Sequence, residues 1–200
     1  IHPDLDFRFD FPPAFQVNNG KTNVVGTDNK GTTIIFDMED PKVATGMPSL
    51  SDYVSRQWAA KAGIKLETLE RLTINELEAA TGTARVNTNK GTRDIRLLAI
   101  RGGRDKIFRF AFLTEPKVTA AMSVPLRKTT YSFRTLSKGE IDTIKAPHIR
   151  LQTVKTGDNP EKLSATMPLG KFNEAWFRAL NLNVLSDGLA AGEKVKVVAN

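Results

Sequence analysis

The chain has 200 residues, of which 40% are hydrophobic and 26% are charged. These proportions are typical of a folded globular protein and exclude a wholly disordered chain. The length suits one sizeable domain, or one domain with a small module. No apolar run approaches the roughly 20 residues that a membrane-spanning helix needs. The chain begins at Ile1 without a recognisable signal peptide, so we expect it to be part of a longer protein.

The chain lacks cysteine and carries a net charge of +7. The lack of cysteine excludes disulfides and thiolate metal sites but leaves the redox compartment open. The charge is uneven, because residues 1–50 hold 4 basic and 7 acidic groups and residues 117–152 hold 7 and 2. A basic surface suits nucleic acid, anionic lipid or anionic wall polymer, and is equally typical of a solvated face. No basic run is dense enough for a nucleic-acid arm, so we expect no nucleic-acid partner.

The first third of the chain predicts strands and one helix. Residues 5–11 alternate between apolar and charged side chains, which predicts a strand with one wet face, ended by Pro12-Pro13. Residues 15–18, 23–27 and 32–36 read as short strands joined by turns at Asn19-Gly20 and at residues 29–31. A helix is expected from Ser49 or Ser51, which cap it, to Ala62.

Four β-prone segments follow, at about 64–73, 76–87, 93–101 and 106–113, with a hairpin turn at residues 102–105. A mainly helical stretch is expected over 118–133, with a kink or restart at Pro125. Residues 138–150 resemble a linker. This order predicts an α+β fold, with a mostly antiparallel sheet and packed helices, for a domain at 1–145.

The last 50 residues predict a strand, two helices and a strand. A β-branched segment at 152–154 runs into a turn at Gly157-Asp158, and the chain closes with a strand at 195–198. The first helix carries Leu163 and Met167 on one side. Trp176 and Phe177 are adjacent on the second helix, so they cannot both face the same core.

This terminal segment, 151–200, resembles the LysM module. Four motifs carry the resemblance in order: Thr153-Val154-Lys155-x-Gly157-Asp158, Leu163-Ser164, Leu180-Asn181, and Leu189-x-x-Gly192-x-x-Val195-Lys196-Val197. The resemblance implies a small β-α-α-β module whose two loops form a shallow groove for polymers that contain N-acetylglucosamine. The loop residues are Gly157, Asp158, Asn159 and Pro160, with Leu182 and Asn183.

The same loop residues have a purely structural interpretation. Asp158 and Asn159 are residue types that cap a helix by accepting hydrogen bonds from its first amides. Leu180 would then be a core residue, and Asn181 would tie the second loop to the module. Both interpretations, glycan contact and capping, stay open on the sequence.

The chain shows no catalytic constellation. Its two histidines, His2 and His148, are isolated, and neither H-E-x-x-H nor zinc-ligand spacing occurs. The carboxylate pairs Glu67 with Glu70 and Glu76 with Glu78 have a spacing that suits acid–base work, but on a charged surface we expect them to face solvent. We therefore expect no catalytic, metal or cofactor-binding residue in this chain.

A second resemblance covers nearly the whole chain. It is carried by these segments: His2-Pro3-Asp4-Leu5, Phe9-x-Phe11-Pro12-Pro13-x-Phe15, Ile74-Asn75-x-Leu77, Asp94-Ile95-Arg96-Leu97, Phe108-Arg109-Phe110, and Ser132-Phe133-Arg134-x-Leu136-Ser137 with Glu140. Together they look like the C-terminal region of bacterial extracytoplasmic zinc-dependent peptidases of the M forty-eight family. Glu76 stands where that pattern has glycine after Ile-Asn.

The second resemblance implies a non-catalytic accessory region of a zinc metalloprotease, with the zinc held by an upstream protease domain. It implies a periplasmic or extracytoplasmic location, with membrane proximity through the parent, and peptidoglycan or envelope proteins as partners. Two alternatives stay open: a free-standing peptidoglycan-binding protein, and a protein-interaction module without sugar binding.

Overall fold

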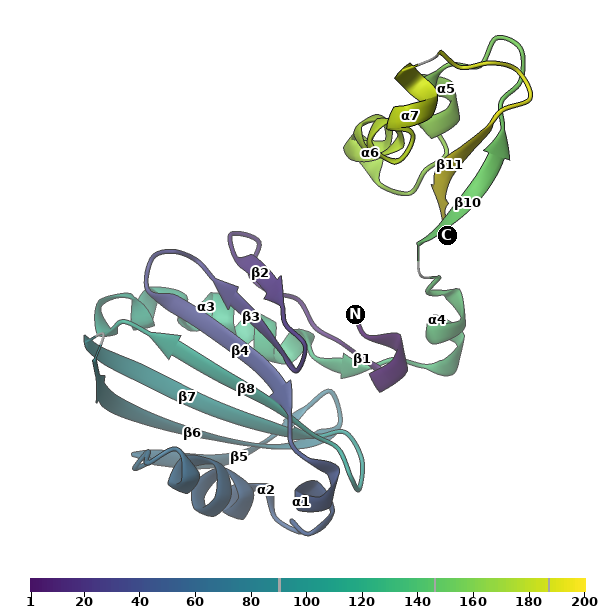
Figure 1. Cartoon of the computed structure of the whole chain (residues 1–200). Helices are drawn as coiled ribbons and strands as arrows, with labels where there is room; N and C mark the ends of the chain where they lie inside the picture. The colour runs from purple at the N-terminus through teal and green to yellow at the C-terminus, as the bar shows by residue number, and fades with distance from the viewer. Residues whose placement is uncertain (90, 146, 187) are drawn as a thin grey trace. The chain divides into compact units, whose positions relative to one another are not determined.

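The chain folds into two compact units, Ile1–Ser137 and Lys138–Asn200. A computed structural model describes residues 1–89, 91–145, 147–186 and 188–200 (Figure 1). The sequence places the boundary somewhat later, between 145 and 151. Residues 138–143, expected as linker, form helix α4 (Lys138–Thr143).

The first unit is built on a seven-stranded antiparallel sheet in the order β2-β3-β4-β8-β7-β6-β5 (Figure 1). Its strands are β2 (Gln16–Asn19), β3 (Asn23–Thr27), β4 (Thr32–Met38), β5 (Thr68–Ile74), β6 (Leu77–Thr88), β7 (Gly91–Arg101) and β8 (Ile107–Thr114). Short helices α1 (Pro41–Thr45) and α2 (Leu50–Asp52), a π-helix η2 (Tyr53–Ala59) and the longer α3 (Pro116–Ser132) complete the layers. The α+β class with a large antiparallel sheet is thus confirmed.

One face of the sheet holds an aromatic core. The alternation in β8 places Phe108, Phe110 and Phe112 on this face, all buried. Phe36 from β4 and Phe133, which follows α3, pack against them. Because aromatic side chains bury large apolar areas, this cluster is the main source of hydrophobic stabilisation on that face.

The N-terminal segment covers part of the aromatic core, although only a fragment of it is a strand. The prediction of one strand over residues 5–11 was wrong: only β1 (Phe7–Arg8) is a strand, and it pairs with β9 (Arg134–Thr135). The alternation nevertheless had a physical cause, because Phe7, Phe9 and Phe11 all pack on the core. Apolar periodicity reports burial of one side, which an irregular extended chain achieves as well as a strand.

The opposite face is covered by α1, α2 and η2. Ser49 caps α2 as expected, since its hydroxyl accepts from the Asp52 amide. Leu50, Tyr53 and Val54 from these helices pack on Leu97 and Ala99 of β7. Two layers of helices therefore sandwich the sheet, α3 on one face and α1, α2 and η2 on the other.

Helix α3 runs from Pro116 to Ser132 as one element, with Pro125 inside it. Of the two alternatives predicted at Pro125, a kink or a restart, the restart is therefore absent. Leu126, Thr129 and Thr130 are its buried residues and face the sheet. The other residues of the helix are half-buried or exposed.

The second unit pairs β10 (His148–Thr153) with β11 (Lys194–Ala199) in an antiparallel ribbon. Between the strands lie the helices α5 (Pro160–Ser164), η3 (Gly170–Phe172), α6 (Asn173–Leu180) and α7 (Leu182–Ser186). Leu163, Met167 and Phe177 are buried with Val195 and Val197 of β11. Trp176 is 51% exposed while its neighbour Phe177 is fully buried, as their adjacency requires.

Candidate functional site

The face of the sheet that carries the aromatic core becomes polar along β6 and β7. On β7, Ile100 and Leu98 lie opposite Phe108 and Phe110, whereas Arg96 and Asp94 lie opposite Phe112 and Thr114. On β6 the same face continues as Thr81, Thr83 and Arg85. The N-terminal phenylalanines pack on the aromatic half of the face, whereas Leu126 and Thr130 of α3 face the polar half.

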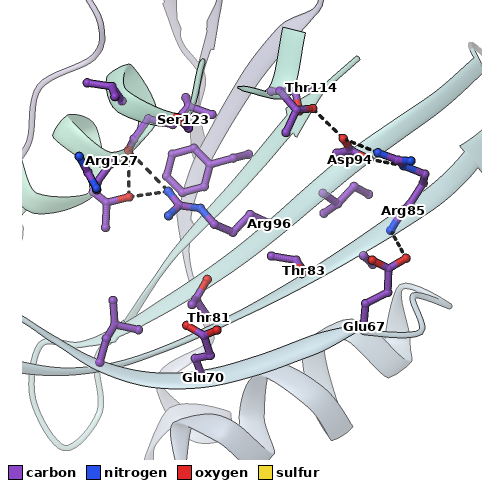
Figure 2. Close-up of a pocket in the computed structure, with 18 of the residues that line it drawn as sticks. Glu67, Glu70, Thr81, Thr83, Arg85, Asp94, Arg96, Thr114, Ser123 and Arg127 are labelled. Carbon is purple, nitrogen blue, oxygen red and sulfur yellow. Dashed lines mark hydrogen bonds and ion pairs between the residues drawn. The ribbon is translucent and has the colours of Figure 1, made fainter. Parts of the chain in front are cut away.

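A cavity of about 570 Å³ lies over this polar half, between the sheet and α3 (Figure 2). Its volume is within the range of small-molecule sites in proteins. Leu72, Phe112, Val124 and Leu126 supply apolar walls, and Thr81 and Thr83 supply hydroxyls. The cavity therefore combines apolar walls with polar and charged groups, which in a ligand site fix the orientation of the ligand.

Arg96 is the central charged group of the cavity (Figure 2). Its Nη2 donates to the Thr130 hydroxyl at 2.6 Å and lies 3.5 Å from the Leu126 carbonyl oxygen. Its guanidinium carbon lies 4.2 Å from the centroid of the Phe112 ring. Among the described residues, no carboxylate forms an ion pair with it, and its Nε and Nη1 have no hydrogen-bond partner.

Burial lowers the pKa of Arg96 to about 10. The group stays protonated at neutral pH, and the lowered pKa means that the folded chain holds this cation at a cost. Contact with an aromatic face offsets part of that cost. A partly buried cation without a counter-ion is uncommon, because buried charges are usually paired.

Two of the other charged groups of the cavity, Arg85 and Asp94, are paired with each other. Arg85 donates from Nε and Nη2 to both carboxylate oxygens of Asp94, at 2.6 and 3.0 Å. The hydrogen bond from Arg85, with a second from Thr119, holds the pKa of Asp94 below its ordinary value. The backbone amide of Arg85 also donates to Glu67, and Glu70 lies further along the rim.

A second arginine, on the opposite face of the sheet, is fully paired. Arg109 donates to both carboxylate oxygens of Asp37 at 2.6 Å, and to Glu39 and the Tyr53 hydroxyl. Tyr53 in turn donates to Glu39, and burial raises its pKa. This closed network joins β4, β8 and η2, so its role is structural, which makes the unpaired Arg96 more distinctive.

The predicted first loop of the second unit lies between β10 and α5. The Asn159 side chain accepts from the Lys162 amide and caps α5, and Pro160 is the first residue of that helix. Asp158 accepts from the Lys155 amide and closes the turn, in which Gly157 has a φ of +83°. The capping interpretation therefore accounts for Asn159, and these contacts leave glycan binding untested.

The predicted second loop is largely helical. Leu182 and Asn183 are the first residues of α7, and Leu182 is 67% exposed. Asn181, just before them, is buried; its amide donates to the Phe177 and Lys196 carbonyls and its oxygen accepts from the Lys196 amide. Asn181 thus ties α6 to β11, as the sequence predicts.

Sequence reasoning missed Arg96 and the cavity around it. The carboxylates Glu67 and Glu70, expected to face solvent, are exposed and also line this cavity. The sequence did contain a signal for this site: Asp94, Arg96, Leu98 and Ile100 occupy every second position of β7 and share one face, so that face changes from apolar to charged along the strand. Whether the charged part forms a site depends on which elements cover it, and the sequence of β7 alone does not determine this.

The described residues contain no group of three or more histidine, aspartate or glutamate side chains placed to hold a metal ion. None of the helices within the described ranges is both long enough and apolar enough to span a membrane.

No family model matches the chain, and no curated protein matches it. Among solved structures, the PsbP protein of the cyanobacterium Synechocystis sp. PCC 6803 (CyanoP) is similar, with a TM-score of 0.51 and 13% identity over 66% of this chain and 88% of that chain. LpqN of Mycobacterium tuberculosis, described as involved in cell envelope biogenesis, has a TM-score of 0.41 and 11% identity over 66% of this chain and 83% of that one. The similarity to CyanoP shows a shared fold and nothing about function.

Proposed function

We propose that this chain is a non-catalytic binding region of a cell-envelope protein, the accessory C-terminal part of a zinc-dependent peptidase. The observation that carries the binding role is the cavity over β6 and β7, in which Arg96 has no carboxylate partner among the described residues. The ordered motifs that resemble the M forty-eight peptidases support the parent protein and its extracytoplasmic location. In this proposal the zinc belongs to the upstream protease domain.

The coding sequence upstream of Ile1 and a peptidase assay test this proposal together. We expect an H-E-x-x-H motif upstream and chelator-sensitive cleavage of casein by the full-length protein but not by residues 1–200. Chelator-sensitive cleavage by residues 1–200 alone would contradict a non-catalytic role. An upstream sequence without the motif would contradict the peptidase parent and favour a free-standing binding protein.

A second candidate function is peptidoglycan binding by the second unit. Its helices, enclosed between the paired strands β10 and β11, support a LysM-like module. Two aromatic side chains, Phe172 of η3 and Trp176 of α6, are 55% and 51% exposed. Exposed aromatic rings offer apolar faces against which sugar rings can pack. The first-loop residues Gly157, Asp158, Asn159 and Pro160 are the other candidate contacts.

Retention on purified peptidoglycan tests the second candidate. If the module binds glycan, the wild-type chain is retained, and Trp176→Ala or Asp158→Ala weakens retention without unfolding the unit. Arg150→Ala, on the exposed strand β10, is the matched control and should be retained like the wild type. Absence of retention at any salt concentration would contradict glycan binding and favour a protein-interaction module.

A further inference from the structure

Arg96 holds hydrogen-bonding capacity that the protein itself does not use. An arginine side chain has five N–H donors, and the described residues engage only Nη2. The guanidinium is fixed from two sides, by the Phe112 ring and by Thr130 on α3. Because its position is fixed before any ligand arrives, little conformational entropy remains to be lost on binding.

The charges of the cavity favour a ligand with no more than one negative charge. Three arginines, Arg85, Arg96 and Arg127, and three carboxylates, Glu67, Glu70 and Asp94, line it, so its formal charge is zero. Arg85 is already bound to Asp94, and Arg127 is exposed on the outer part of α3. A doubly charged phosphate would have only Arg96 as its inner partner and would be repelled by the nearby carboxylates.

The walls indicate that the ligand also has an apolar part. Leu72 lies on one side, and Val124 and Leu126 of α3 lie on the other. The Thr81 hydroxyl donates to the Leu97 carbonyl, which leaves its oxygen free to accept from a ligand N–H group. A carboxylate next to an amide and an apolar side chain, as at the end of a peptide, matches each of these surfaces.

We propose that the cavity between β6, β7 and α3 binds a monocarboxylate with an apolar body, and that Arg96 holds the carboxylate through its free N–H groups. The chemistry is shared by two sources: the C-terminal carboxylate of a peptide and a free organic acid. This inference rests on one part of the proposed function, that the first unit is a binding domain. It does not depend on whether the chain belongs to a peptidase or on whether the second unit binds glycan.

Calorimetric titration of the 200-residue chain tests this inference with four probes. They are N-acetyl-leucyl-leucine with a free carboxylate, the same dipeptide as its C-terminal amide, hexanoate, and inorganic phosphate. We expect the free acid to bind about 10-fold or more tightly than the amide, because a hydrogen bond to a charged group contributes about 1.5–3 kcal/mol. Phosphate should bind more weakly than either acid.

Two variants locate the contact. Arg96→Met keeps the aliphatic part of the side chain and should lose the preference for the acid over the amide. Arg104→Met, which removes an exposed arginine outside the cavity, should bind the acid within about threefold of the wild type. Tighter binding of the dipeptide than of hexanoate supports a peptide terminus, and equal binding supports a free acid.

The comparison of the four probes uses the wild-type chain alone, so it tests the inference even if a variant is unstable. Equal affinity for acid and amide, tighter binding of phosphate than of both acids, or no binding of either acid at millimolar concentration would each overturn the inference. None of these results bears on the sequence upstream of Ile1, so failure here is separate from failure of the peptidase proposal.

Discussion

The guanidinium carbon of Arg96 lies 4.2 Å from the centroid of the Phe112 ring, and the two residues are direct cross-strand partners in β7 and β8. This pair marks the boundary between the aromatic core and the polar half of the same sheet face. A cation at such a boundary is partly removed from water, and here the described residues give it no counter-ion. The partly buried Arg96 cation therefore costs the folded chain free energy, and an anionic ligand can lower this cost by pairing with it.

Arg96→Met should leave the ligand-free protein as stable as the wild type, or more stable by about 1 kcal/mol. Replacing a buried charge by an apolar side chain of similar volume is often neutral or stabilising. Thr130 keeps a partner in the variant, because its hydroxyl donates to the Leu126 carbonyl. Urea denaturation at neutral pH measures the free energy of unfolding, and a loss of 2 kcal/mol or more would show that Arg96 is structural.

Arg109→Met should have the opposite effect and lower the free energy of unfolding by about 2 kcal/mol. The substitution leaves Asp37, Glu39 and the Tyr53 hydroxyl without their shared donor. Removal of one partner from a buried network costs more than its net contribution, although partial exposure of these groups reduces the loss. Urea denaturation beside Arg96→Met checks the contrast, and equal stabilities of the two variants would refute it.

Asp94 should contribute stability that depends on pH. Its pKa in the folded chain is lowered from 3.8, so the ionised carboxylate is the form that the fold favours. The contribution is fully present above about pH 5 and is lost as the pH falls through the lowered pKa. We expect Asp94→Asn to be less stable than the wild type at pH 7 and to converge with it near pH 2 in thermal unfolding. A difference that persists unchanged at pH 2 would exclude ionisation as its cause.

Glu76→Gly should raise the free energy of unfolding by about 1 kcal/mol. Asn75 and Glu76 form the two-residue turn between β5 and β6, with φ angles of +46° and +70°. A turn with two positive φ angles favours glycine at its second position, because a side chain there is strained. Chemical denaturation checks the gain, with Glu76→Ala as the matched control, which retains Cβ and should show none. A similar gain in both variants would point to loss of the charge instead.

Phe177 and Trp176 should differ sharply in their effect on the second unit. Phe177→Ala removes a fully buried ring from the small core and should destabilise the unit by about 3–5 kcal/mol. Trp176→Ala should change its stability by no more than about 0.5 kcal/mol, because the side chain is half exposed. Hydrogen exchange of β10 and β11 amides measures both, and similar losses would mean that Trp176 belongs to the core.

Local patterns predicted most of the strands. The runs at 23–27 and 106–113 and the turn at residues 102–105 have clear alternation and turn chemistry, and the structure has β3, β8 and a turn closed by the Gly102 amide and the Lys106 carbonyl there. The strand predicted at residues 5–11 was wrong, because the same alternation occurs there in a mostly irregular segment that packs on the core. The helix predicted over 118–133 is present as α3, which continues through Pro125 without a restart despite one missing amide donor.

The candidate cavity could not be predicted from the sequence, for a different reason. Arg96, Thr81 and Thr130 come from three elements that meet only when β6, β7 and α3 are packed. In the sequence Arg96 looks like one more charged residue in a strand. Its lack of a carboxylate partner is visible only after the other charges have been paired, as Arg85 is with Asp94.

The side-chain Nε–H resonance of Arg96 tests the central claim most directly. Nuclear magnetic resonance of the 200-residue chain, titrated with N-acetyl-leucyl-leucine, reports whether the carboxylate reaches this group. We predict a saturable shift of the Arg96 Nε–H, accompanied by the amides of Thr81, Thr83 and Thr130, and no such shift with the C-terminal amide. An Arg96 resonance that stays fixed while other residues respond would contradict the assignment of this cavity.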